Sequence, residues 1–382
     1  MMTVSGLTLV SRILGFLRDM VMMHLLGVSK VTDAFFAAFR FPNMFRRIFG
    51  EGAYNAAFVP LFGKKLEQEG HDAAVKFARN TFSSLLLALG LITLIAIPCM
   101  HWIMAIVVPG FLPKFESHLG YVGAGESHPT VEVNTRGARD VYILVKGKSD
   151  EAVGHWADRI EFHSTVVVNA DGEEEPLFPN KEDFEIEGMT VGAGAYQLDE
   201  GGLVRIRFPD DHRYEAFKGQ FEISPSAEGE EVRKADLLVY RNDPDTFRLT
   251  VQLSRIMFCY LLFMALAAHL SGVLNTFKIF GMPAAAPIIL NITLLVGLVL
   301  IWQLGYIAGT TLAWSVAVAG FLQFTALWLS CARNGAPMIV ARPKWNADLQ
   351  RLLILMGPGV AAAGIQQVNL LVGGIIASNS HF

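Results

Sequence analysis

The chain alternates long apolar runs with short polar connections, except for one long polar block in its middle. A helix needs about 20 mostly apolar residues to cross the hydrocarbon core of a bilayer. Seven runs approach that length, at 5–27, 33–62, 80–110, 248–276, 283–304, 307–331 and 350–378. The pattern predicts a polytopic α-helical membrane protein with about seven transmembrane helices, three within 1–115 and four within 243–382.

The polar block, residues 116–242, has a different character from the rest of the chain. It holds 26 Asp and Glu against 13 Lys and Arg, a net charge of −13, whereas the remainder carries +9. Its apolar residues form short runs rich in β-branched and aromatic types, separated by turn signals such as Asn169-Ala170-Asp171-Gly172. The block is therefore predicted to be an inserted small all-β domain, a sandwich or barrel of six or seven strands.

The distribution of Lys and Arg over the short connections predicts the orientation in the membrane. The 63–79 connection carries four cations, the 332–351 connection carries four, and Lys278 lies between the fourth and fifth helices. Alternating helices place these connections on one side, which the positive-inside rule makes cytoplasmic. The N-terminus is then cytoplasmic as well, and residues 116–242 lie on the periplasmic or extracellular side.

The first two predicted helices contain charged residues that are costly at membrane depth. A charge at the bilayer centre costs roughly 2.5–3.5 kcal/mol on insertion scales, so such residues normally face a cavity on a substrate path. Asp33, Arg40 and Arg47 are seven apart and share one face, which Glu51 continues. Several arginines in one cavity suit a phosphate or pyrophosphate. The alternative is that arginines near helix ends reach out to lipid headgroups, an explanation best suited to Arg40.

Four segments together resemble the MurJ (MviN) family of lipid II flippases: SRILGFLRD at 11–19, TDAFFAAFRFPNMFRRIFGEGAYNAAFVPLF at 32–62, SRIMFCYLLFMALAAHLSGVLNTFKIFGMPAAAPIILNI at 254–292 and GIQQVNLLVGGIIAS at 364–378. The resemblance covers roughly 1–115 and 244–378. It implies the MOP/MATE-like flippase fold in the bacterial inner membrane. It also implies alternating-access transport of lipid II, the undecaprenyl-pyrophosphate-linked peptidoglycan precursor, as part of cell wall biogenesis.

The resemblance further implies a set of substrate-binding residues in the cavity. These are Arg12, Arg18, Asp33, Arg46, Arg47, Glu51 and Arg255. The sequence departs from the family pattern in three respects. Members have about fourteen helices in two lobes, whereas this sequence reaches only the seventh. An acidic residue frequent in that helix is replaced by Gly373-Gly374, and residues 116–242 have no counterpart.

Other classes of function find less support in the sequence. No nucleophile elbow, phosphate loop, zinc spacing or paired catalytic carboxylates are recognisable, so no enzyme activity, metal or cofactor is expected. Nucleic-acid binding is not expected either, because no basic face rich in aromatics stands apart from the apolar segments. Two alternatives stay open. One is an exporter of another polyprenyl-linked oligosaccharide, and the other a non-transporting membrane anchor that displays the β domain to a glycan or protein partner.

Overall fold

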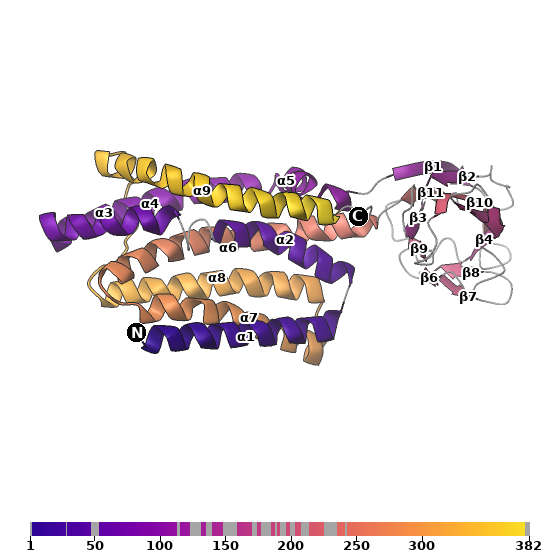
Figure 1. Cartoon of the computed structure of the whole chain (residues 1–382). Helices are drawn as coiled ribbons and strands as arrows, with labels where there is room; N and C mark the ends of the chain where they lie inside the picture. Colours follow the sequence, from indigo (N-terminus) through magenta and orange to yellow (C-terminus); the bar gives the residue numbers. More distant parts are fainter. Residues whose placement is uncertain are drawn as a thin grey trace. The chain divides into compact units, whose positions relative to one another are not determined.

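A computed structural model describes residues 2–112 except 28 and 47–52, the strands between 115 and 240, and residues 243–378. The chain divides into two compact units (Figure 1). The first is helical and comprises Met1–Val108 and Thr246–Ile375. The second comprises Pro109–Asp245 and Ile376–Phe382 and contains the strands.

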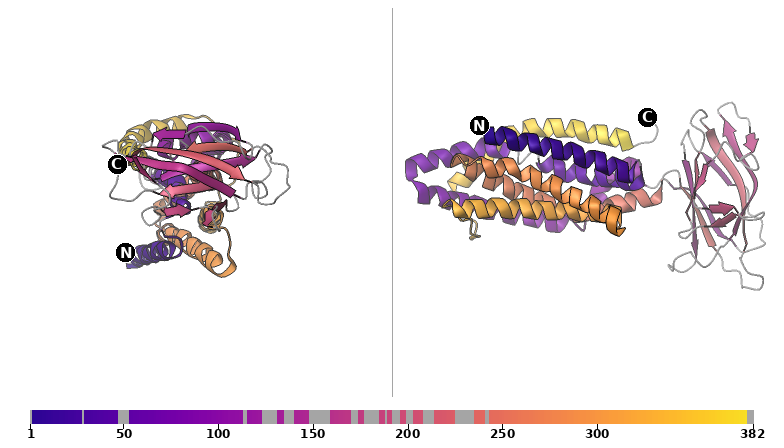
Figure 2. Two further views of the ribbon diagram at one scale, coloured as in Figure 1. Left: turned by 90° about the vertical axis from the view of Figure 1, so that its right-hand side faces the viewer. Right: turned by 90° about the horizontal axis from the view of Figure 1, so that it is seen from below.

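The helical unit is a bundle of roughly aligned helices (Figures 1 and 2). Its helices are α1 (Met2–Leu26), α2 (Lys30–Arg46), α3 (Ala53–Glu69), α4 (His71–Ala96), α5 (Met100–Val107), α6 (Pro244–Thr276), α7 (Gly281–Leu304), α8 (Ala308–Arg333) and α9 (Ala347–Ser378). Within the described residues, four helical segments are long and apolar enough to cross a membrane: His71–Ala96, Asp245–Thr276, Gly281–Leu304 and Ala308–Arg333. The total of seven spans stays a prediction.

One of the predicted helices is divided in the structure. The range 33–62 contains α2 and α3, and residues 47–52 between them lie outside the described residues. The range 80–110 contains the C-terminal part of α4, a turn at 97–99, and the short helix α5. The prediction of one continuous helix over 80–110 was therefore wrong, because Pro98 lies in the turn and proline ends or kinks a helix even within an apolar run.

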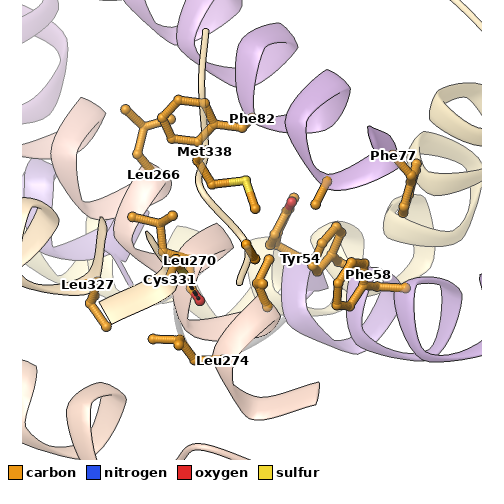
Figure 3. Packing of buried hydrophobic residues seen from close by; sticks show 14 of the residues in the cluster. Tyr54, Phe58, Phe77, Phe82, Leu266, Leu270, Leu274, Leu327, Cys331 and Met338 are labelled. Carbon is orange, nitrogen blue, oxygen red and sulfur yellow. Dashed lines mark hydrogen bonds between the residues drawn. The ribbon is translucent and has the colours of Figure 1, made fainter. Parts of the chain in front are cut away.

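Aromatic rings and small residues fill the core of the bundle. One cluster is formed by side chains of α3, α4, α6, α8 and the segment after α8, among them Tyr54, Phe58, Phe82 and Leu270 (Figure 3). Glycine permits close approach of helices, as at Gly320 of α8, where a Cβ would lie 2.7 Å from the ring of Tyr260 of α6. At this position α8 and α6 are in close contact.

The second unit contains strands arranged in two sheets (Figure 2). The strands are β1 (Phe115–Val122), β2 (Val131–Asn134), β3 (Asp140–Gly147), β4 (Arg159–Asn169), β5 (Glu174–Pro176), β6 (Glu185–Glu187), β7 (Met189–Val191), β8 (Tyr196–Leu198), β9 (Leu203–Arg207), β10 (Tyr214–Ser224) and β11 (Ala235–Tyr240). One sheet has the order β1-β11-β3-β9-β6 and the other β2-β10-β4-β8-β7, with β5 beside β4.

Most successive described strands pass from one sheet to the other, while β4 pairs with β5 and β7 with β8 within one sheet. The predicted short runs rich in β-branched and aromatic residues coincide with β2, β3, β4, β6, β9, β10 and β11. The described strands also include β1, β5, β7 and β8, three of which are only three residues long. The first and last strands, β1 and β11, pair antiparallel with Phe115 opposite Tyr240. The unit therefore begins and ends at neighbouring positions of one sheet.

Candidate functional site

The seven residues expected to bind substrate are distributed over three helices and an undescribed segment. Arg12 and Arg18 lie on α1, Asp33 and Arg46 on α2, and Arg255 on α6. Arg47 and Glu51 fall outside the described residues, and nothing is described of the Arg46 side chain. Arg12, Asp33 and Arg255 are exposed, whereas Arg18 is half-buried.

Arg18 is the predicted site residue whose position the structure defines most closely. Its Nε and Nη2 donate to Oδ1 of Asp19 at 2.9 and 2.7 Å, and its Nη1 donates to Oδ1 of Asn291 at 2.9 Å. These bonds use three of the five N–H donors of a guanidinium group, so within the described part of the chain two remain for a ligand. The side chain keeps 20% of its exposure, which leaves the group within reach of a ligand.

Asn291 of α7 was not predicted from the sequence, although it fixes Arg18 in place. Its side chain is only 6% exposed and its Nδ2 donates to the carbonyl of Ser11 at 2.9 Å, so one amide bridges α1 and α7. Gly15 of α1 lies beside it, since a Cβ there would be in ordinary van der Waals contact with the amide nitrogen at 3.6 Å. The only sequence signal was a lone asparagine in the apolar run MPAAAPIILNITLLVGLVLIW, far from Arg18 along the chain.

On α2, the charged and aromatic residues separate onto different faces. Asp33 and Arg40 are exposed, while Phe35 is buried beside Phe39, with ring centroids 5.9 Å apart. Phe35 and Phe39 also line a small cavity of about 20 Å³ that Arg18 and Asp19 border from α1. The aromatic side of α2 therefore packs toward the α1 charges, and its charged side faces out of the bundle.

A larger cavity of about 460 Å³ lies elsewhere in the bundle, lined by parts of α1, α3, α6, α7 and α8. Its lining includes Thr8, Ser271, Asn275 and Gln323 but no charged side chain. Gln323 is 1% exposed and its Nε2 donates to the carbonyl of Ala286 at 2.9 Å. This cavity is mainly apolar and has no charged side chain in its described lining, so that lining does not share the anion-binding chemistry of Arg18.

Among the described residues, no group of three or more His, Cys, Asp or Glu side chains is arranged to hold a metal ion. The three cysteines, Cys99, Cys259 and Cys331, are free thiols. The local chemistry available at Arg18 is therefore that of an oriented cation with spare donors beside a carboxylate.

The fold and site together define a class: a multi-helix membrane protein with charged groups placed on helices of an otherwise apolar bundle. Within that class, the family model described as "Lipid II flippase MurJ" matches residues 22–120 and 234–381, and the chain belongs to this family. Asp33, Arg46, Arg47, Glu51 and Arg255 lie inside the matched ranges, whereas Arg12 and Arg18 precede them.

Individual relatives agree with the family match. The chain is 29% identical over 379 residues to a probable lipid II flippase MurJ of Rhizobium tropici, covering 98% of this chain and 47% of the relative. A lipid II flippase MurJ of Burkholderia cenocepacia is 24% identical, with coverage of 99% and 49%. The chain thus spans about half the length of the curated relatives it matches.

A solved structure shows the same fold. It is described as "Lipid II flippase MurJ, inward closed conformation" and superposes with a TM-score of 0.53 at 18% identity, covering 99% of this chain and 51% of that chain. At this level of identity the likeness concerns the fold alone.

Proposed function

We propose that the helical unit forms the substrate-recognising lobe of a lipid II flippase of the bacterial inner membrane, a transporter rather than an enzyme. The observation that carries the proposal is the Arg18 guanidinium, held by Asp19 and Asn291 with two donors to spare. Membership of the family and the names of the relatives support it. The proposed ligand is the pyrophosphate of lipid II or of a similar polyprenyl-linked glycolipid.

The chemistry of recognition follows from the state of Arg18 before the ligand arrives. A guanidinium already oriented by neighbours loses little conformational freedom when it grips an anion. Hydrogen bonds between charged groups are about twice as strong as neutral ones, and more so where water is scarce. We propose that Arg12, Asp33, Arg46, Arg47, Glu51 and Arg255 border the same substrate cavity.

The exposed positions of Arg12, Asp33 and Arg255 support a cavity that lies beside the bundle rather than inside it. Alternating access requires two halves that move against each other. The relatives are about twice the length matched here, so we assign recognition of the lipid-linked substrate to these helices and the transport cycle to a two-lobed assembly.

For the strands we propose an inserted β domain spanning 116–242, between helical segments 1–115 and 243–382, on the periplasmic side of the membrane. Three observations support this. The block has a net charge of −13, its first and last strands are paired neighbours, and residues 121–233 lie between the two ranges matched by the family model. A glycan or a protein is the proposed partner of this domain.

Ligand binding to the purified chain tests the recognition proposal. Arg18→Ala should weaken binding of lipid II at least tenfold, since each lost charge-assisted hydrogen bond is worth about 1.5–3 kcal/mol. Arg18→Lys should restore binding only in part, because lysine lacks the planar two-donor geometry. Arg40→Ala is the matched control, an exposed arginine on α2 that should bind nearly as wild type.

Equal affinity of wild type and Arg18→Ala for lipid II would refute the pyrophosphate-binding role. A second ligand separates the two substrate classes. If another undecaprenyl-pyrophosphate-linked oligosaccharide binds as tightly as lipid II, the chain recognises polyprenyl pyrophosphates in general, as the alternative exporter would.

A further inference from the structure

The connection between α8 and α9 lies against α4 and is held there through its backbone. We call residues 335–346 the strap. Side chains of Arg79, Asn80 and Ser83 on α4 make the bonds. Arg79 Nε donates to the Pro337 carbonyl at 2.8 Å, Ser83 Oγ accepts from the Ala341 N–H at 3.0 Å, and the Asn80 amide bonds both backbone groups of Lys344 at 2.7 and 2.8 Å.

Further bonds fix both ends of the strap. Trp328 Nε1 of α8 donates to the Met338 carbonyl at 2.9 Å, and Met338 itself is buried. Asn346 Oδ1 accepts from the Leu349 N–H at 3.0 Å and so caps the first turn of α9. An irregular segment with this many fixed backbone groups presents its side chains in a defined arrangement.

The side chains that the strap presents to its surroundings are apolar and cationic. Ile339, Val340 and Trp345 are 59%, 63% and 70% exposed, and Arg342 and Lys344 are exposed among them. The nearby carboxylate of Asp348 is bonded to Lys65 Nζ at 2.8 Å, so its charge is partly balanced by a cation outside the strap.

The strap also lies at the level where a membrane surface is expected. The α4 residues that bond to the strap come shortly after Lys76, where the apolar part of α4 begins. The α3–α4 connection meets the strap here, because Gly335 lies next to His71. The range 63–79 carries four Lys and Arg beside three acidic residues, and the range 332–351 carries four beside one. The positive-inside rule, which counts Lys and Arg, places both at the cytoplasmic face.

We propose that the strap is a binding surface for anionic phospholipid headgroups of the cytoplasmic leaflet. Tryptophan favours the boundary between headgroups and acyl chains, and Ile339 and Val340 can enter the same layer. The cations meet the phosphates of a leaflet that carries negative surface charge. Apolar side chains and cations held in one short segment match such lipids, whereas zwitterionic lipids satisfy only the apolar part. This inference is independent of the proposed transport function.

Quenching of Trp345 fluorescence tests the proposal on the full chain in lipid vesicles. Phosphatidylcholine vesicles receive a minor fraction of either brominated phosphatidylglycerol or brominated phosphatidylcholine, and subtraction of a Trp345→Phe variant isolates the Trp345 signal. We expect stronger quenching by the anionic lipid. The double variant Arg342→Gln, Lys344→Gln should need about 30-fold more brominated phosphatidylglycerol for half-maximal quenching. Each cation near an anionic surface strengthens binding roughly fivefold.

The control variant is Lys278→Asn. It removes an exposed cation of the α6–α7 connection, and asparagine tolerates the positive φ of 63° at that position. Its quenching should equal that of the wild type. Equal quenching of Trp345 by the two brominated lipids would overturn the proposal, as would a double variant that keeps the preference for phosphatidylglycerol. A Trp345 that neither lipid quenches would show that the strap faces water or another protein.

Discussion

Substitution of Asn291 tests whether this buried amide positions Arg18. Asn291→Ala removes the acceptor for Arg18 Nη1 and the donor to the Ser11 carbonyl, both at 2.9 Å. Hydrogen bonds between helices in membranes are worth about 0.6 kcal/mol on average and about 1.7 at most. Because one of the lost bonds involves a half-buried cation, we expect about 1.5 kcal/mol, which is roughly a tenfold shift in the unfolding equilibrium.

The aspartate variant separates positioning from stability. Asn291→Asp keeps an acceptor for Arg18, so it should be more stable than Asn291→Ala. It also adds a carboxylate beside a guanidinium already bonded to Asp19, and should therefore weaken binding of undecaprenyl pyrophosphate more than alanine does. Thermal unfolding in detergent and a binding titration measure the two effects. Thr293→Val is the control, because that hydroxyl bonds only the Ile289 carbonyl of its own helix in the described structure, at 2.7 Å.

A double-mutant cycle decides whether Asn291 acts through Arg18. In an Arg18→Ala background, Asn291→Ala should no longer change ligand affinity, and its cost in stability should fall to that of the Ser11 bond alone. Additive effects of the two substitutions on affinity would refute the positioning argument. So would an Asn291→Asp variant that binds the pyrophosphate as well as the wild type does.

Three further predictions concern packing, pH and topology. Gly320→Ala should destabilise the bundle by about 1–3 kcal/mol in thermal unfolding, because the new Cβ would lie 2.7 Å from the ring of Tyr260. The control Gly90→Ala should not destabilise it, because a Cβ at Gly90 would have nothing within 4 Å. The hydrogen bond to Asp348 raises the pKa of Lys65 above its ordinary value. The stability lost in Lys65→Met, less than about 1 kcal/mol, should therefore be constant at neutral pH and vanish as the pH rises through that raised pKa; a loss confined to acidic pH would contradict this. Glu174→Cys in a background without the native cysteines should react with a membrane-impermeant thiol reagent in intact spheroplasts, and labelling only after lysis would place the strands in the cytoplasm.

The sequence supports the helical character of the chain and its family, because apolar length and the four quoted segments are local properties of the sequence. Helix ends were harder to predict than helices, as α4 and α5 show: Pro98 lies in the turn at 97–99 and marks a helix end, but the apolar run continues through it. Short strands such as β7 and β8 were missed because three residues carry too little alternation to recognise.

The site was predictable only in its charged members. Arg18 stood out because a charge in an apolar helix is costly, whereas Asn291 has no comparable signal. Its role arises from a contact between residues 273 positions apart, which only the packing of α1 on α7 creates. The same holds for the strap, whose anchors Asn80 and Ser83 are ordinary polar residues until the fold brings residues 341 and 344 against them.

The pairing of Phe115 with Tyr240 places the two ends of the strand-bearing segment next to each other. Opposed residues of an antiparallel pair have Cα atoms about 5 Å apart, and one peptide step covers about 3.8 Å. Excision of everything between these two residues would therefore leave a gap that one or two residues could close. A segment with coincident entry and exit can be gained or lost during evolution without requiring the surrounding helices to rearrange.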